Sequence, residues 1–371
     1  MNSKERVLTA VGLGQPDRVP LDFSANAATL SRLHRDLGTT THRELLDRLH
    51  VDVLDLRGVV DPIYRGPIPK ERWLPGDVKE NFWGWRTKVM QTAMGPEECY
   101  VDFSLSGATS IEQLAAHPWP QPDWFDFTGF AERLDADAWR DLAIMASGAS
   151  IWQHPTFLRG LERLLMDLLE EPEIATYLLD RFTDFYVAYF DRMFTAAAGR
   201  IDILRIADDL GMQHGLLISP RLFDRCFAPR LVKLVEMAHS HRVKVMFHSC
   251  GAIVPFVERI IALGVDILDP LQVAADGMDP QGIKQRFGSR ICLHGAIDTQ
   301  YVLPRGMPED VSNAVRQMVA ILGAGGGFIL APSHVLQTDV PTKNVLTLYE
   351  TGHATGVGSC NAPLTAREVG A

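Results

Sequence analysis

The sequence lacks any apolar run long enough to span a bilayer, because its longest one, around Val319 to Pro332, is interrupted by glycine. It also lacks the positive excess of a nucleic-acid-binding surface, since 36 basic against 46 acidic residues give a net charge of -10. No low-complexity tract suggests an extended disordered arm. We therefore expect a cytoplasmic protein with neither nucleic acid nor membrane as a partner.

The sequence has little cysteine. Its five cysteines are odd in number and widely scattered: Cys99, Cys226, Cys250, Cys292 and Cys360. That pattern does not resemble the disulfide framework of a small secreted domain. In a reducing compartment these residues are free thiols or metal ligands.

What the 371 residues do contain is a repeated alternation of short apolar runs with longer helical patterns. Ser219-Pro220 and Asp279-Pro280 each place a capping residue before a proline, which is typical of a helix start. The runs predicted as strands are Val19–Phe23, Val51–Leu56, Leu142–Met145, Ile201–Ile206, Val243–His248, Val265–Leu268, Ile291–His294 and Gly327–Leu330. Eight strand–helix units predict an α/β fold of the (β/α)₈ TIM-barrel class, whereas a doubly wound sheet usually stops nearer six strands.

We expect one barrel domain over residues 1–352 and a C-terminal tail over 353–371. Residues 83–103 alternate in the manner of a small antiparallel hairpin inserted between the second and third strands. The proline-rich stretch 115–126 predicts an irregular crossing segment. Both insertions are candidate lids over the carboxyl-terminal face, although their aromatic residues could simply anchor the loops to the scaffold.

In a parallel barrel the active site lies at the carboxyl ends of the strands, so the informative residues follow each apolar run. Among them, His248 and Cys250 end one predicted strand and can point to the same side. An imidazole and a thiolate suit zinc, and a catalytic zinc site needs a third protein ligand. His334, after the last strand, is the best third ligand by position, although for an isolated His-x-Cys a buried Cys and a satisfied His are the usual explanation.

Other polar residues at strand ends could have either a functional or a structural role. Asp208 is expected to face the mouth and to orient a ligand or contact substrate as a catalytic residue, whereas Asp209 could equally be a solvated turn residue. Ser147 also follows a strand. Substrate contacts are predicted for Arg57, Asp269, His294 and Asp298; structural hydrogen bonding is an equal alternative for His294 and Asp298, and Asp269 is a reserve metal ligand.

Several blocks together resemble the uroporphyrinogen decarboxylase superfamily. The resemblance covers most of the chain, from about Ser3 to Gly352. The blocks are Asp17-Arg18-Val19-Pro20, Ile218-Ser219-Pro220, His248-Ser249-Cys250-Gly251, Gly295-Ala296-Ile297-Asp298-Thr299-Gln300, and Pro332-Ser333-His334 with Asp339-Val340-Pro341 and Asn344. Each block alone is weak, but the set is specific.

The resemblance implies one of two activities. The superfamily includes true decarboxylases and zinc methyltransferases that move a methyl group between a corrinoid protein and a thiol or other acceptor. The methyltransferases carry a His-x-Cys pair and a later Cys near the last strand; here His248 and Cys250 match the pair, but His334 stands in the later position. The decarboxylases bind porphyrinogen carboxylates with an arginine-rich segment, whereas the matching residues 22–27 contain no arginine.

We therefore expect a zinc-dependent methyltransferase whose corrinoid, if it uses one, arrives on a separate protein. One alternative is a metal-independent decarboxylase or demethylase of a small aromatic acid, with Arg57 and the tryptophan-rich insertions forming its pocket. Another is a non-catalytic corrinoid- or tetrapyrrole-binding protein. The sequence identifies neither the methyl donor nor the acceptor, and it leaves a homodimer open.

Overall fold

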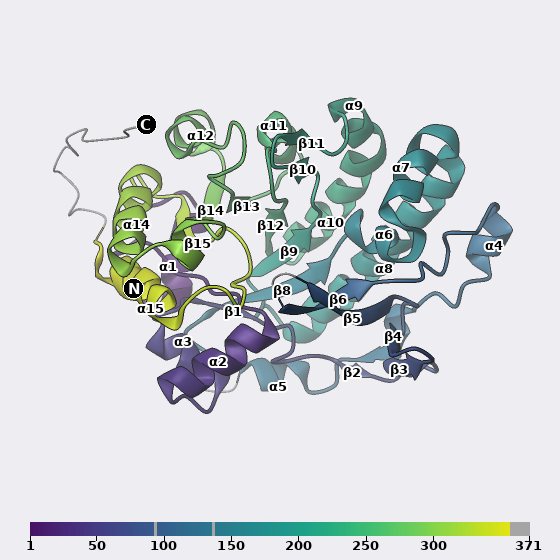
Figure 1. The fold of residues 1–371 in the computed structure, drawn as a ribbon, viewed down its shortest axis with the longest axis horizontal. Coiled ribbons are helices and arrows are strands. Elements are labelled where there is room, and N and C mark those ends of the chain that lie inside the picture. Colours follow the sequence, from purple (N-terminus) through teal and green to yellow (C-terminus); the bar gives the residue numbers. More distant parts are fainter. Residues whose placement is uncertain (93–94, 136–137, 357–371) are drawn as a thin grey trace.

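The centre of the molecule is a curled, seven-stranded parallel sheet surrounded by helices (Figure 1). The computed structural model describes residues 1–92, 95–135 and 138–356. The strand order is β1-β8-β9-β12-β13-β14-β15. The strands are β1 (Val53–Asp55), β8 (Ala143–Ala149), β9 (Ile203–Ala207), β12 (Lys244–His248), β13 (Ile267–Leu271), β14 (Cys292–Ile297) and β15 (Phe328–Pro332). All of them lie where the apolar runs predict strands, which confirms the α/β barrel class.

The predicted first strand, Val19–Phe23, occupies the gap between β15 and β1 as a single bridge at Leu21. Leu330 N–H donates to Pro20 O and Asp22 N–H donates to Leu330 O, while Asp52 N–H donates to Leu21 O on the other side. A regular ladder does not form because Pro20 has no N–H and the Leu21 N–H donates to the Asp52 carboxylate instead. The segment still links the two ends of the sheet.

The helices lie outside the sheet and follow the strands in the order expected of βα units (Figure 1). Ser219 and Asp279 cap α9 and α12 as predicted, each with proline at the first helical position. The helices after the strands are α6 (Gln153–Arg159), α7 (Leu161–Glu170), α8 (Pro172–Ala197), α9 (Pro220–Leu222), a π-helical turn (Phe223–Phe227), α10 (Ala228–Ser240), α11 (Val254–Ala262), α12 (Pro280–Phe287), α13 (Val302–Arg305), α14 (Pro308–Leu322) and α15 (Thr342–Ala354).

Three further helices precede the sheet: α1 (Ser3–Val11), α2 (Ala27–Leu37) and α3 (His42–Arg48). Helix α1 begins with a capping box between Asn2 and Glu5. Its apolar residues pack against inward-facing residues near the amino ends of the strands and form one buried cluster: Val7, Ala10, Val11, Val53, Ala143, Met145, Ile203, Met246, Ile267, Cys292 and Ile329. We call the strand residues of this set the lower layer. The amino-terminal end of the barrel is therefore filled, as in other barrels of this class.

The predicted hairpin within 83–103 is part of a larger insertion. Four antiparallel strands follow one another in order: β3 (Glu71–Leu74), β4 (Val78–Asn81), β5 (Arg86–Thr92) and β6 (Gly95–Tyr100). The Trp83 ring is buried and stacks on Phe182 of α8 at 4.6 Å. At this position the aromatic residue anchors the insertion to the scaffold.

Residues 115–126 are less irregular than their prolines indicate. Short helices α4 (Ile111–Ala115) and α5 (Phe130–Leu134) flank the stretch, which contains a 3₁₀ turn (Pro122–Trp124). Strand β7 (Phe125–Asp126) then pairs with β2 (Ile63–Tyr64). Irregularity is confined to the residues around Pro118 and Pro120, because proline removes backbone donors there.

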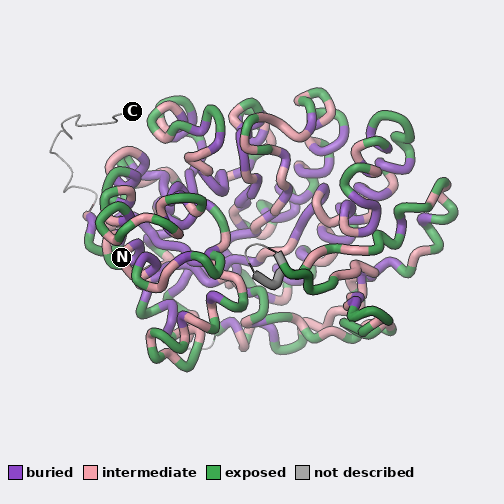
Figure 2. The backbone as a smooth tube through the Cα atoms, viewed as in Figure 1, coloured by how far each residue is buried: buried purple, intermediate pink, exposed green. Residues whose placement is uncertain are grey.

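The most deeply buried segments are the strands and the inner faces of the helices (Figure 2). Helix α15 ends at Ala354, and most of the predicted tail, including Cys360, lies outside the described residues. No helix in the described part of the chain is long and apolar enough to cross a membrane.

Candidate metal centre

A polar layer lies one step along the strands from the apolar lower layer. Side chains alternate across a strand, so residues two positions further on face the same interior. Met246 is followed by His248, Ile267 by Asp269 and Cys292 by His294. The set, which we call the upper layer, comprises Asp55, Ser147, Arg205, His248, Asp269 and His294. All except Ser147 line one hollow at the carboxyl ends of the strands.

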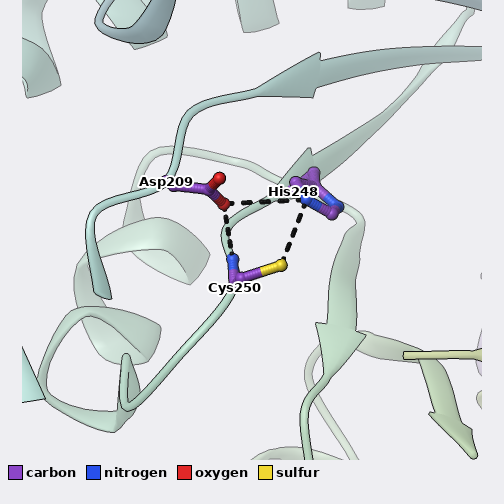
Figure 3. Close-up of side chains that lie close together, drawn as sticks. All are labelled: Asp209, His248 and Cys250. Carbon is purple, nitrogen blue, oxygen red and sulfur yellow. Dashed lines mark hydrogen bonds and ion pairs between the residues drawn. The ribbon is translucent and has the colours of Figure 1, made fainter. Parts of the chain in front are cut away.

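Three ligand-type atoms converge at the edge of this layer (Figure 3). His248 Nε2 lies 3.5 Å from Cys250 Sγ and 3.7 Å from Asp209 Oδ1. The three atoms all lie within 4.8 Å of one another. Zinc bond lengths and tetrahedral angles place a ligating nitrogen and sulfur about 3.5 Å apart and a nitrogen and oxygen about 3.4 Å apart. The donor set and its spacing therefore fit a zinc ion.

His248 is held from behind by a carboxylate. Its Nδ1 lies 2.8 Å from Asp269 Oδ2 and 2.7 Å from Arg205 Nη2. A guanidinium only donates and a carboxylate only accepts, so two tautomers of the ring compete. A cation at Nε2 selects the tautomer that donates from Nδ1 to Asp269, which is the usual carboxylate–histidine arrangement behind a metal.

The Cys250 thiol lies in surroundings that disfavour its anion when no cation is bound. Burial raises its pKa well above the ordinary value, and the Asp209 and Asp269 carboxylates raise it further, against the opposing effect of Arg205. The Asp209 carboxylate also accepts a hydrogen bond from Cys250 N–H at 2.8 Å. A divalent cation between these groups would balance the negative charge and favour the thiolate.

Asp269 connects the site to the rest of the upper layer. Its Oδ2 accepts from Arg205 Nε at 2.7 Å, and its Oδ1 accepts from His294 Nδ1 at 2.7 Å. His294 Nε2 lies 3.0 Å from Asp22 Oδ2. Both ring nitrogens of His294 face carboxylates, and only an imidazolium can donate from both. Burial alone would lower the pKa of His294, but Asp269 and Asp22 outweigh it and raise the value to about 9.

The orientation expected for the pair Asp208 and Asp209 is wrong. Asp208 is buried and accepts hydrogen bonds from Ser150 Oγ and from the backbone N–H groups of 151–153, at the start of α6. Burial raises its pKa to about 6, against the lowering effect of these donors. Asp209 points into the site instead, so the catalytic role predicted for Asp208 has no support in its contacts.

His334 also differs from the expected geometry, whereas Asp298 has the structural hydrogen bonds expected as the alternative to substrate contact. Asp209, and not His334, completes the group of three ligands found among the described residues. His334 is exposed and lines the same hollow as His248. Asp298 accepts from the N–H groups of Gln300, Tyr301 and Val302, so it fixes the turn into α13. Arg57 is exposed and belongs to the lining of the hollow, and its contact with substrate stays a prediction.

Sequence reasoning missed Arg205 and Asp22 and undervalued Asp209. Arg205 lies inside an apolar run, and one signal could have found it: a single cation at an inward position of a predicted strand. Asp22 begins the arginine-free segment 22–27, and its carboxylate directly after an apolar run is the signal that could have found it. Which of two adjacent acids points inward depends on the local turn, and no residue pattern indicates it.

One family model matches more than half of the chain. The family model described as uroporphyrinogen decarboxylase matches residues 130–355. The uroporphyrinogen decarboxylase of Alkalilimnicola ehrlichii is 23% identical over 261 residues, which is 68% of each chain. That of Coxiella burnetii is 25% identical over 188 residues, 49% of this chain and 48% of the relative. The match thus spans about half the length of the Coxiella protein.

Among solved structures, a methyltransferase from Methanosarcina mazei aligns over 95% of this chain and 99% of its own length. Its TM-score is 0.62 and its sequence identity 17%. At that identity the likeness shows the fold alone.

Proposed function

This chain belongs to the uroporphyrinogen decarboxylase family, and we propose that it is a zinc-dependent methyltransferase in which Asp209, His248 and Cys250 hold the metal. The observation that carries the proposal is the convergence of one oxygen, one nitrogen and one sulfur at separations suited to a tetrahedral zinc ion. Three protein ligands leave one position for substrate, which is the pattern of catalytic zinc sites.

Zinc held by Asp209, His248 and Cys250 would supply Lewis-acid chemistry: it would lower the pKa of an acceptor thiol that ligates it, so that the acceptor sulfur would be a thiolate at neutral pH. Methyl transfer would form a bond between that sulfur and the methyl carbon and would break the bond between the methyl carbon and its donor, which would keep the electron pair. The thiol proton would leave to solvent when the acceptor binds.

The protein's own contribution is orientation and charge balance. Asp269 fixes the ring of His248, and Arg205 and the imidazolium of His294 compensate the charge of Asp269. Arg57 and His334 line the hollow through which an acceptor reaches the site. The corrinoid, in this proposal, is carried by a separate protein that docks over the mouth.

Two further observations support a methyltransferase over a porphyrinogen decarboxylase. No arginine occurs between residues 22 and 27, where the decarboxylases bind substrate carboxylates, and Asp22 is instead committed to His294. A porphyrinogen would leave its carboxylates without partners on that side. The Methanosarcina protein of similar fold is also a methyltransferase.

Metal analysis of the purified protein tests the proposal. We expect about one zinc per chain, and we expect Cys250→Ser and Asp209→Asn each to lose most of it, because each removes one of three ligands. Cys226→Ser is the matched control, since Cys226 is a buried cysteine on the π-helical turn outside the site. Absence of zinc in all variants, or retention in Cys250→Ser, would contradict the proposal.

Decarboxylation of a small aromatic acid is the second candidate function. Arg57 and Arg205 line the same hollow and could pair with a carboxylate. The curated relatives matched here are named as decarboxylases. This reading requires activity without metal, so the same zinc measurement separates it from the first.

A further inference from the structure

A second, wider hollow borders the candidate metal centre and opens to solvent. Asp209 and Cys250 form part of its lining, and Ser333 and His334 are shared with the inner hollow. Four of its lining residues carry primary amides: Asn26, Gln272, Gln300 and Gln337. These come from the amino-terminal segment and from the loops after β13, β14 and β15, so amides occur on several sides of the mouth.

The amides are held in place by one another. Asn26 Nδ2 donates to Gln337 Oε1 at 2.8 Å. On the other side, Gln272 Nε2 and Gln300 Nε2 both donate to Oε1 of Gln213, at 3.2 and 3.4 Å. Gln213 itself donates to Ala274 O at 2.5 Å. We call these five residues, Asn26, Gln213, Gln272, Gln300 and Gln337, the amide rim.

The rim keeps unused hydrogen-bonding capacity toward the hollow. Each primary amide offers two donors and an oxygen with two lone pairs. Within the described part of the chain, Gln300 Oε1 and Gln337 Nε2 have no hydrogen-bond partner, although both side chains line the hollow. One side thus presents a free acceptor and the other a free donor.

The charges around the hollow are unsuited to a polyanion. Its lining residues in the described chain include no lysine or arginine, and the only carboxylates are those of Glu98 and Asp209. Carboxylates of a ligand would meet these acids without a cationic partner, and desolvating them would be costly. A neutral ligand that both donates and accepts hydrogen bonds meets no such penalty.

We propose that the amide rim recognises the neutral primary amides around the edge of a corrin ring, pairing amide with amide, and thereby rejects tetrapyrroles that carry carboxylates. The ring would bind over the mouth, in the hollow that Asp209 and Cys250 help to line. This inference rests on the proposed methyltransferase function for the identity of the ring, but its recognition chemistry comes from the rim itself.

Two probes with the same macrocycle test the inference. Dicyanocobinamide carries amide side chains, whereas dicyanocobyrinic acid carries carboxylates in their place. Equilibrium binding to the full-length protein, followed by the visible absorption of each probe, is expected to favour the amide form by at least tenfold at neutral pH. Equal binding, preference for the acid, or no binding of the amide form would overturn the inference.

Variants of similar size connect that preference to the rim. Gln337→Glu replaces the free Nε2 donor by a carboxylate oxygen, and Gln300→Met removes the free Oε1 acceptor at similar side-chain size. Each is expected to weaken binding of the amide probe about fivefold, the effect of one neutral hydrogen bond. Gln317→Glu, on the exposed face of α14, is the matched control for added charge. Unchanged binding in both rim variants would assign recognition elsewhere.

Binding of these probes requires neither zinc nor turnover, so the two proposals fail separately. If the protein contains no zinc but still prefers the amide probe, the inference about the amide rim holds and the methyltransferase proposal fails. If the protein contains stoichiometric zinc but does not distinguish the two probes, the metal centre is supported and the inference about the amide rim fails.

Discussion

The lower and upper layers of the barrel interior come from the same strands and differ in almost every physical respect. The lower layer is apolar and packs against α1. The upper layer, two residues further along, consists of charged and hydrogen-bonding side chains that lie around one hollow. On β13 the two layers are represented by Ile267 and Asp269, both almost fully buried.

The difference shows that one strand serves stability at one end and chemistry at the other. The lower layer gains free energy from burial of apolar surface. Burying the charged groups of the upper layer costs stability, and the cost is limited because each charged group has an oppositely charged partner or, like Asp55, accepts hydrogen bonds. Each layer therefore has its own expected response to substitution.

Removal of the Asp269 carboxylate should have the largest effect. In Asp269→Ala, Arg205 and His294 lose their shared anion, and uncompensated buried charge costs about 3–5 kcal/mol. Urea denaturation measures this loss. Asp276→Ala is the control, because that carboxylate is exposed and pairs with the exposed His214. A loss below about 1 kcal/mol in Asp269→Ala would mean that the upper layer is not an ionic network.

The charge on His294 should make stability depend on pH. Its pKa is about 9 when folded, against about 6.5 when unfolded, so its protonation contributes about 3 kcal/mol. Because the folded pKa is the higher one, this contribution is complete below about pH 6.5 and is lost as pH rises through about 9. The free energies of unfolding of wild type and His294→Gln, measured at intervals between pH 6 and 10, should approach each other as the pH rises. A constant difference between the two would show that His294 is neutral in the fold.

Much of the scaffold could be predicted from the sequence, because apolar runs of β-branched residues have few other uses in a soluble protein. His248 and Cys250 were found for the same reason, since both directly follow such a run. The ligand role of Asp209 was not predictable, because the turn after β9 directs Asp208 to backbone donors and Asp209 to the site. The path of the loop, and not the residue type, determines which of the two carboxylates points into the site.

Arg205 was missed for a different reason. Its strand is apolar on both sides, because one face packs on helices and the other on the lower layer, so alternation gives no warning of a buried cation. The segment around Leu21, which links β15 to β1, was predicted as a strand and forms a single bridge. The sequence does not show which neighbouring strand would need the backbone N–H that Pro20 lacks.

A smaller effect is expected from Ser147→Ala. The hydroxyl of Ser147 lies 2.8 Å from both oxygens of Asp55, and Ser147 is the member of the upper layer without an acidic or basic side chain. Loss of one hydrogen bond to a partly buried carboxylate should cost about 1.5 kcal/mol. Urea denaturation measures the cost, and an isosteric Ser147→Cys variant separates loss of the hydroxyl from loss of volume. A neutral result would indicate that Asp55 finds water as a replacement donor.

The smallest effect should come from shortening Ile267, two residues before Asp269 on the same strand. Ile267→Val removes one buried methylene and should cost about 1 kcal/mol, the usual value for such a change in a packed core. The variant keeps every hydrogen bond of the upper layer, so its zinc content and affinity should equal those of wild type, whereas Asp269→Ala should lower zinc affinity about 10–100-fold through loss of the support behind His248. Zinc titration against a competing chelator measures both variants. Tenfold weaker zinc binding in Ile267→Val would mean that the two layers do not act independently, because lower-layer packing would then position the ligands.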